Sequence, residues 1–346
     1  MFNILNEYMK CIACGACEKT CPAGISGKKI IELYKQNKDD ELIDYLYNLN
    51  PFSNICCHIC PEDFCKNKCF KGIDLQELHK YFSKSTNIIK NQVFDKGKVA
   101  IVGGGVSGLT ASWYLLNKGY DIDLWDYNRK LGGELNLIPE SRLSKEIIEQ
   151  NLNPIIKHSH FKHVQLHFEN VDELSYDKII YCCGCKPKPL DIEIVGPCCE
   201  YYDTYLSRPS ENENVAIIGG GKVALDCALY NKGKSTIFIR RNYWDMKLTK
   251  KEFDLLLEKK IRIISNFKPS RIETFMSTYD CDLTGYITLP NNMLQKESFE
   301  FDRVVIAIGK EPIKINTDKG IIIQPSNTVV ETVINTVKQL ENYFKK

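Results

Sequence analysis

The stretch Val99-Ala-Ile-Val-Gly103-Gly-Gly105-Val-Ser-Gly108 decides the fold of this chain. A short apolar run precedes three glycines at the spacing G-x-G-x-x-G, and a helical pattern follows over Ser107–Asn117. A second apolar run, Ile122–Trp125, comes next. This order predicts a strand, a tight turn, a helix and a parallel strand, which together form the βαβ unit of a nucleotide-binding α/β domain.

The glycines of this turn have separate physical roles. They permit a tight turn, a close approach of the backbone to a pyrophosphate, and close packing of helix on sheet. The helix N-terminus then offers free N–H groups to the anion. Asp126, 18 residues beyond Gly108, can accept hydrogen bonds from a ribose diol. A glycine turn in an unrelated α/β protein is the alternative. We expect a dinucleotide here, contacted by Gly103, Gly105, Val106, Ser107, Gly108 and Asp126.

The same order of elements returns later in the chain. Val215–Ile218 reads as a strand, Val223–Tyr230 as a helix and Thr236–Ile239 as a second strand. Ala224 takes the third glycine position, which the fingerprint tolerates. A second dinucleotide site is therefore predicted, with contacts from Gly219, Gly220, Gly221, Lys222 and Val223.

Two arginines, Arg240 and Arg241, follow the last strand of this second unit, where a site for NAD(H) would place an acid. Two guanidinium groups suit the 2′-phosphate of NADP(H). We therefore expect NADP(H) in preference to NAD(H). The alternative is an arginine pair that is merely solvated at the end of a strand.

Composition excludes several classes of protein. The 346 residues are 43% hydrophobic and 26% charged, and the net charge of +2 favours neither disorder nor a polyanionic partner such as nucleic acid. No apolar run reaches the about 20 residues of a membrane span, and Met1–Lys10 lacks the layout of a signal peptide. We expect a cytoplasmic protein with no membrane contact.

The sixteen cysteines indicate metal or redox chemistry. Disulfide scaffolds are small and secreted, whereas this chain is long and shows no export signal. Nine of them fall between Cys11 and Cys69, and the run Cys11-x2-Cys14-x2-Cys17-x3-Cys21-Pro22 has the ferredoxin spacing, in which the fourth cysteine binds a second cluster. Structural zinc usually takes two separated C-x2-C pairs, so zinc explains the run poorly. Further thiols for a second [4Fe–4S] cluster are available at Cys56, Cys57, Cys60, Cys65 and Cys69.

The chain is predicted to be α/β, with a small α-helical iron–sulfur domain that holds two clusters, followed by two Rossmann-like domains. Helical spacing occurs at Lys28–Asn37, Asp39–Leu49 and Leu75–Phe82, and Arg303–Ile308 reads as a buried strand before a closing helix at Thr328–Phe344. The expected domains are the iron–sulfur domain at 1–95, a discontinuous FAD domain at 96–190 and 309–346, and an inserted NAD(P)H domain at 191–308.

With these motifs the chain resembles the small subunit of glutamate synthase and the N-terminal part of dihydropyrimidine dehydrogenase. Leu131-Gly-Gly133 and the segment from Ile138 to Glu146 are similar to the flavin signature of that family, and Ile239-Arg-Arg241 to its NADPH-phosphate signature. The resemblance implies FAD at the first glycine turn and NADPH at the second. It adds the expected cofactor contacts Gly132, Gly133, Arg142, Gly184 and Gly309.

The resemblance also implies the ligands of both clusters. The first cluster would take Cys11, Cys14, Cys17 and Cys69. The second would take Cys21, Cys60 and Cys65, with His79 at the position where relatives have a glutamate or glutamine. Imidazole is a competent ligand of iron–sulfur centres. Alternatively Cys56 or Cys57 closes the second cluster, and His79 lies on the helix surface.

The chain departs from the family near its C-terminal end. Relatives carry a Gly-Asp pair before the last helix, whose aspartate contacts the flavin, but Lys319–Thr328 contains no such acid. The expected function is an NAD(P)H-dependent oxidoreductase subunit that exchanges electrons with a catalytic partner subunit or ferredoxin, and no catalytic acid–base residue is predicted. A stand-alone ferredoxin or acceptor reductase and an electron-relay subunit without flavin are the alternatives. A thioredoxin reductase needs a redox-active pair of cysteines in its nicotinamide domain. No cysteine lies between Cys227 and Cys281, which argues against that enzyme.

Overall fold

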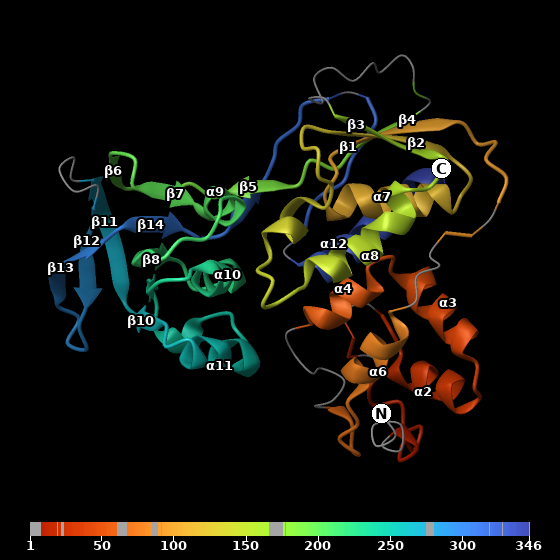
Figure 1. Cartoon of the computed structure of the whole chain (residues 1–346), viewed down its shortest axis with the longest axis horizontal. Helices are drawn as coiled ribbons and strands as arrows, with labels where there is room; N and C mark the ends of the chain where they lie inside the picture. The colour runs from red at the N-terminus through yellow and green to blue at the C-terminus, as the bar shows by residue number, and fades with distance from the viewer. Residues whose placement is uncertain are drawn as a thin grey trace. The chain divides into compact units, whose positions relative to one another are not determined.

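The computed structural model describes most of the chain and divides it into two compact units (Figure 1). The first unit comprises Met1–Asn136, Arg142–Gly184 and Pro312–Lys346, and the second comprises Leu137–Ser141 and Cys185–Glu311. The described residues are 8–18, 20–21, 24–60, 68–84, 89–90, 92–165, 176, 178–274, 280–317, 319–326 and 328–345.

The N-terminal part of the first unit is a set of short helices. They are α2 (Gly27–Lys35), α3 (Asp39–Leu49), α4 (Ser53–His58) and α6 (Leu75–Phe82). Side-chain caps fix where two of them begin: Ser26 accepts a hydrogen bond from the Lys29 N–H, and Asp74 accepts from the N–H groups of Gln76 and Glu77. Leucines, isoleucines and aromatic side chains from α2, α3 and α6 form one buried cluster.

The rest of the first unit is built on a five-stranded parallel sheet in the order β16-β4-β1-β2-β3. The C-terminal helix α12 packs against α7 (Figure 1). The elements of this part of the chain are β1 (Lys98–Val102), α7 (Val106–Leu116), β2 (Asp121–Asp126), η1 (Gly133–Leu137), α8 (Lys145–Ile156), β3 (Phe161–Gln165), β4 (Lys178–Tyr181), β16 (Ile321–Ile322) and α12 (Val329–Phe344).

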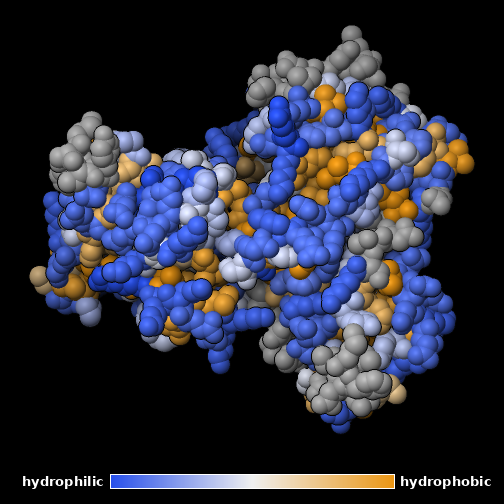
Figure 2. All heavy atoms as spheres, in the orientation of Figure 1, coloured by the Kyte–Doolittle hydropathy of each residue, from blue (hydrophilic) through white to orange (hydrophobic). Residues whose placement is uncertain are grey.

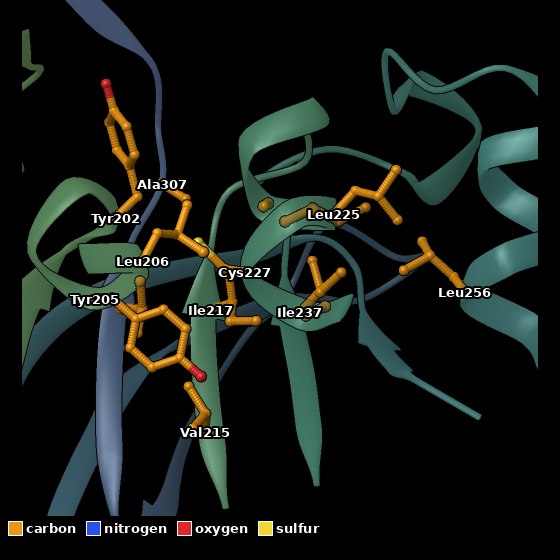
Figure 3. Packing of buried hydrophobic residues seen from close by; sticks show 14 residues of the cluster. Tyr202, Tyr205, Leu206, Val215, Ile217, Leu225, Cys227, Ile237, Leu256 and Ala307 are labelled. Carbon is orange, nitrogen blue, oxygen red and sulfur yellow. The ribbon is translucent and has the colours of Figure 1, made fainter. Parts of the chain in front are cut away.

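The second unit has its own five-stranded parallel sheet, in the order β10-β9-β8-β14-β7. Its apolar strands and the helix α10 meet in a core that includes Val215, Ile217, Leu225 and Ile237 (Figure 3). The elements are β7 (Cys199–Tyr201), α9 (Tyr202–Ser207), β8 (Val215–Ile218), α10 (Lys222–Tyr230), β9 (Ser235–Phe238), η4 (Tyr243–Asp245), α11 (Lys250–Glu258), β10 (Arg262–Ile264) and β14 (Arg303–Ile306).

A second, four-stranded sheet in this unit did not follow from the sequence. β11 (Phe267–Thr274), β12 (Cys281–Thr288) and β13 (Leu294–Phe301) form an antiparallel meander, and β6 (Glu193–Val195) pairs parallel with β11. A disulfide joins Cys198 to Cys281, and both residues are buried. The remaining strands, β5 (Cys185–Pro187) and β15 (Lys310–Pro312), form a two-stranded ribbon.

The predicted α/β class is confirmed, and each predicted βαβ unit occurs in its own parallel sheet. The domain boundaries proposed from the sequence remain a prediction. Hydrophilic residues cover much of the face seen in Figure 2, with hydrophobic residues showing between them. Among the described residues, no helix is long and apolar enough to cross a membrane.

The first glycine turn leads to a prediction about stability. A Cβ at Gly108 would overlap the carbonyl oxygen of Gly103, whereas a Cβ at Gly105 would meet no atom within 4 Å. We expect Gly108→Ala to lower the free energy of unfolding by about 3 kcal/mol, because the helix must move away from the turn. Gly105→Ala, the matched control, should change it by less than about 0.5 kcal/mol.

Urea denaturation of the full chain freed of any bound dinucleotide, followed by far-ultraviolet circular dichroism, measures both variants, so that loss of a ligand from the turn does not contribute to the difference. Equal stability of Gly108→Ala and Gly105→Ala would contradict the close approach of α7 to the turn.

Candidate functional site

The first glycine turn lies at the carboxyl end of β1, between β1 and β4. Gly103 has a φ of +108°, and a Cβ there would overlap the carbonyl group of Cys182 at the end of β4. The backbone can therefore pass between the two strand ends only because the residue is glycine. This close approach places the N-terminus of α7 directly at the edge of the sheet.

The N-terminus of α7 is left open toward solvent. Gly105 is the N-cap residue and supplies no side-chain hydrogen bond to the helix. The first N–H groups of the helix, at Val106, Ser107 and Gly108, therefore have no side-chain cap, and the space in front of Gly105 is empty to 4 Å. A helix start of this kind binds an anion such as a pyrophosphate.

Asp126 lies at the end of β2, beside this turn. Its two carboxylate oxygens accept hydrogen bonds from the N–H groups of Gly104, at 2.5 Å, and Asn128, at 2.7 Å. Each carboxylate oxygen has a further lone pair that can accept a hydroxyl group. The residue is thus held at the edge of the empty space, which is the position expected for the acid that binds a ribose.

The segment Leu131–Gly133 closes against the same turn. The N–H of Gly132 donates to the carbonyl of Gly104 at 2.8 Å, and a Cβ at Gly133 would come within 2.9 Å of the Gly105 Cα. The structure therefore brings both glycines to the predicted dinucleotide site, although they are about 30 residues away in sequence. Gly184 follows β4 with a φ of +70°, and a Cβ there would meet nothing within 4 Å.

Two further predicted contacts lie elsewhere. Arg142 precedes α8 in the first unit and is partly buried. Gly309 belongs to the second unit, where its carbonyl accepts a hydrogen bond from the Lys188 N–H.

The thiol of Cys183, after β4, lies near Asp126. Burial raises the pKa of this thiol to about 11, and the Asp126 carboxylate contributes to the rise.

The second glycine turn repeats the geometry of the first. Gly219, with a φ of +143°, leaves no room for a Cβ against the carbonyl group of Ala307, which follows β14. Gly221 caps α10 without a side chain, and a Cβ there would again meet nothing within 4 Å. Lys222 and Val223 form the first turn of α10, and the Lys222 ammonium lies 3.8 Å from the buried Glu252 carboxylate.

Arg240 and Arg241 follow β9 directly and are both exposed. Neither forms an ion pair with any residue in the described part of the chain. The Arg241 carbonyl accepts a hydrogen bond from the Asn266 N–H, which fixes the backbone while the side chain stays in solvent. Met246, a little further along, approaches Gly220 of the glycine turn. The guanidinium groups are therefore available to an anion next to this turn.

Four cysteines that the resemblance assigned to the first cluster line one pocket, which is partly open to solvent. They come from the loop before α2 and from Cys69, before α6. Burial raises the pKa of Cys17, and the thiols of Cys11 and Cys69 raise it further. The lining cysteines are Cys11, Cys14, Cys17 and Cys69.

This donor set fits a [4Fe–4S] cluster, in which each thiolate binds a different iron. In the described ranges, no three His, Cys, Asp or Glu side chains stand close enough to bind a single metal ion. A cubane does not require that arrangement, because its four thiolates surround the cluster instead of meeting at one atom.

The residues predicted for the second cluster are less completely described. Cys65 lies outside the described residues. Burial raises the pKa of the Cys56 thiol to about 12, and the nearby thiols of Cys21 and Cys60 contribute to this rise. The alternative ligand Cys56 is therefore close to two of the predicted ligands. Asn50 donates a hydrogen bond to the Cys56 sulfur at 3.2 Å.

His79 is 8% exposed, so it does not lie on the helix surface. Its Nε2 is 2.7 Å from the Ser53 hydroxyl on α4. Burial, with a smaller effect of His58, lowers the pKa of His79 to about 4, so the imidazole is neutral at pH 7. Its Nδ1 has no hydrogen bond within the described chain. A neutral imidazole with one nitrogen held by a hydrogen bond is the form that binds metals.

Sequence reasoning missed Gln76, one turn before His79 on α6. Its side-chain amide is buried and donates hydrogen bonds to the carbonyls of Cys57, at 2.6 Å, and Cys60, at 3.4 Å. The i, i+3 spacing from His79 places both side chains on one face of the helix, and this spacing was visible in the sequence. Gln76 thus contacts the backbone of a predicted ligand more directly than His79 does.

Two family models match the chain. Residues 97–330, more than half of the chain, match the pyridine nucleotide-disulphide oxidoreductase family. Residues 2–90 match dihydropyrimidine dehydrogenase domain II, a 4Fe-4S cluster domain. The second match confirms the resemblance predicted from the cysteine runs.

Two relatives match nearly the whole chain. The NAD-dependent dihydropyrimidine dehydrogenase subunit PreT of Escherichia coli K12 is 26% identical over 364 residues, which cover 95% of this chain and 84% of PreT. The NADPH-Fe(3+) oxidoreductase subunit beta of Geobacter sulfurreducens is 24% identical, and the match covers 91% of this chain and 54% of that subunit.

Solved structures share the fold at low identity. A complex of 2-naphthoyl-CoA reductase has a TM-score of 0.64 at 16% identity, over 92% of this chain and 49% of that one. Thioredoxin reductase of Lactococcus lactis has a TM-score of 0.54 at 16% identity, over 72% of this chain and 98% of that one. With the family model spanning both parallel sheets, the chain belongs to the pyridine nucleotide-disulphide oxidoreductase family and is an oxidoreductase with a 4Fe-4S domain.

Proposed function

We propose that this chain is an NAD(P)H-dependent flavoprotein subunit that passes electrons between NAD(P)H, FAD and two [4Fe–4S] clusters, to or from a partner protein. The observation that carries the proposal is the thiol-lined pocket, which belongs to the same compact unit as the first glycine turn. An enzyme that converts two-electron hydride transfer into one-electron transfer needs both a dinucleotide site and a one-electron centre, and this unit contains candidates for both.

In this proposal the first glycine turn binds FAD. The N–H groups at the start of α7 bind the pyrophosphate, and Asp126 accepts the ribose hydroxyls. When bound, FAD would supply the exchange between two-electron hydride chemistry and one-electron transfer to iron–sulfur clusters. The second turn binds the pyrophosphate of NAD(P)H at the start of α10 in the same way.

The names of the two relatives described above support a subunit that works with a partner, since both are called subunits. Two alternatives remain distinct. A stand-alone acceptor reductase would be a monomer in gel filtration and would reduce ferredoxin without another chain. A relay subunit without flavin is motivated by Lys319–Thr328, which lacks the acid that contacts flavin in relatives.

The absorption spectrum of the anaerobically purified chain tests this proposal. We expect flavin maxima at about 370 and 450 nm, one FAD per chain, about eight iron atoms for two cubanes, and bleaching of the flavin by NADPH. Gly105→Ala should lose FAD and keep its iron, because the added methyl group fills the space meant for the pyrophosphate. A wild-type chain with iron but no flavin would make it a relay subunit and refute the proposal.

The proposed preference for NADP(H) rests on the exposed Arg240 and Arg241, and the names of the relatives point both ways, to NAD and to NADPH. We expect the double variant Arg240→Ala/Arg241→Ala to raise the KM for NADPH by roughly 30-fold, since each charge-assisted contact to a phosphate contributes about 1–2 kcal/mol. The KM for NADH should change less than about twofold. Lys232→Ala, at another exposed site of the second unit, is the control. An equal loss with both coenzymes would contradict a 2′-phosphate site.

His79 is proposed as the fourth ligand of the second cluster, bound through Nδ1 while Ser53 holds Nε2. We expect His79→Cys to lower the midpoint potential of that cluster, because imidazole raises it relative to thiolate. Glu77→Ala, at an exposed position of the same helix, should leave the potential and the electron paramagnetic resonance signal of that cluster unchanged. If the signal responds to Cys56→Ala and not to His79→Cys, the ligand is not His79.

A further inference from the structure

The rim of the thiol-lined pocket exposes large apolar side chains. Phe70 is 82% exposed and Ile12 is 60% exposed, and both line the pocket beside the ligand cysteines. Met9, also 60% exposed, lies nearby, since the Lys35 ammonium donates hydrogen bonds to the carbonyls of both Met9 and Cys11. Aromatic and aliphatic side chains this exposed, gathered at one opening, are typical of a contact surface.

Lysines surround these apolar side chains. Lys28 and Lys71 line the pocket, and Lys10 and Lys68 precede Cys11 and Cys69 in the sequence. Among the described residues, Lys10, Lys68 and Lys71 have no carboxylate partner.

The acids at this place compensate the lysines only in part. Glu32 lies 3.8 Å from Lys28, and Glu18 accepts a hydrogen bond from Ser26. Among the described residues at this opening, the five lysines outnumber these two glutamates, and this excess favours a positive charge there; they are Lys10, Lys28, Lys35, Lys68 and Lys71.

We propose that this surface, which we call the cluster rim and define as Met9, Lys10, Ile12, Lys68, Phe70 and Lys71, docks a small acidic electron-carrier protein of the ferredoxin type. The inference rests on the proposed function, because it names the chemistry of the partner that the function requires. The positive rim attracts an acidic carrier, and the apolar side chains contact it once it has arrived.

The composition of the rim favours a transient carrier over a permanent subunit. Obligate interfaces are large and mostly apolar, whereas this surface combines a few apolar side chains with lysines that have no carboxylate partner in the described part of the chain. Lysine ammonium groups are strongly hydrated, so water replaces their contacts when the two proteins separate, which suits repeated binding and release. A carrier on the rim also lies next to the exposed Cys14, which matters because electron transfer slows steeply with distance.

Binding of a small acidic ferredoxin to the full, iron-loaded chain tests this inference. The dissociation constant is measured at low and high ionic strength by biolayer interferometry under anaerobic conditions. We expect wild-type binding to weaken at least tenfold between 20 and about 300 mM salt, because the attraction is screened. Lys68→Glu/Lys71→Glu should weaken it at least tenfold at low salt, and Phe70→Ser should weaken it about threefold at both salt concentrations.

Matched controls lie in the same helical module. Lys38→Glu/Lys84→Glu changes the charge by as much at two exposed lysines, and Leu49→Ser removes an exposed apolar side chain of α3. Both should bind ferredoxin like the wild type. Should the double variant lose iron, Lys10→Glu and Met9→Ser test the same rim without changing the residues around Cys69.

Absence of ferredoxin binding by the wild type, binding that does not respond to salt, or equal losses in rim and control variants would overturn the inference. The readout is binding, so its failure is distinct from that of the proposed function. A chain that binds ferredoxin through the rim but contains no flavin would keep the inference and refute the function, whereas a flavin-loaded chain with no ferredoxin binding would do the reverse.

Discussion

The close approach of backbone to backbone at the two glycine turns is the constraint on which both α/β parts depend. At Gly103 and again at Gly219, the chain passes against the carbonyl group that ends a neighbouring strand, with no room for a Cβ. Each approach aims the start of a helix at the edge of a parallel sheet. The N-cap glycine of each helix, Gly105 or Gly221, then faces empty space, so the same steric rule that shapes the fold leaves room for a phosphate.

The helical module solves a different problem, since its thiols come from two places far apart in the chain. The loop before α2 carries Cys11, Cys14 and Cys17, and the buried cluster formed by α2, α3 and α6 holds Cys69 against it. The apolar residues of these short helices thus position the thiols around the pocket. The caps Ser26 on α2 and Asp74 on α6 determine where these two helices begin and therefore where the cysteine loops before them end.

Much of the candidate site follows from local patterns. The glycine spacing, Asp126 and the arginine pair belong to short strand–turn–helix units, in which the order of residues determines the geometry. Partial alternation of polar and apolar residues in the meander β11–β13 is a strand signal that was overlooked, and Pro269 in β11 and Gly285 in β12 weaken it. Gln76 was missed because its significance comes from carbonyls of Cys57 and Cys60, which only packing of α6 against α4 brings near.

The sequence by itself determined the fold class, the two dinucleotide turns and the ferredoxin-type cysteine run, because each depends on contacts between residues close together in the chain. The grouping of Cys69 with Cys11, Cys14 and Cys17 was implied by the resemblance, and the structure brings all four to one pocket. Only the tertiary structure decided that His79 is buried against Ser53, and that Phe70 is exposed beside lysines with no carboxylate partner among the described residues. Burial and charge balance at these positions arise from segments distant in sequence, so no local pattern encodes them.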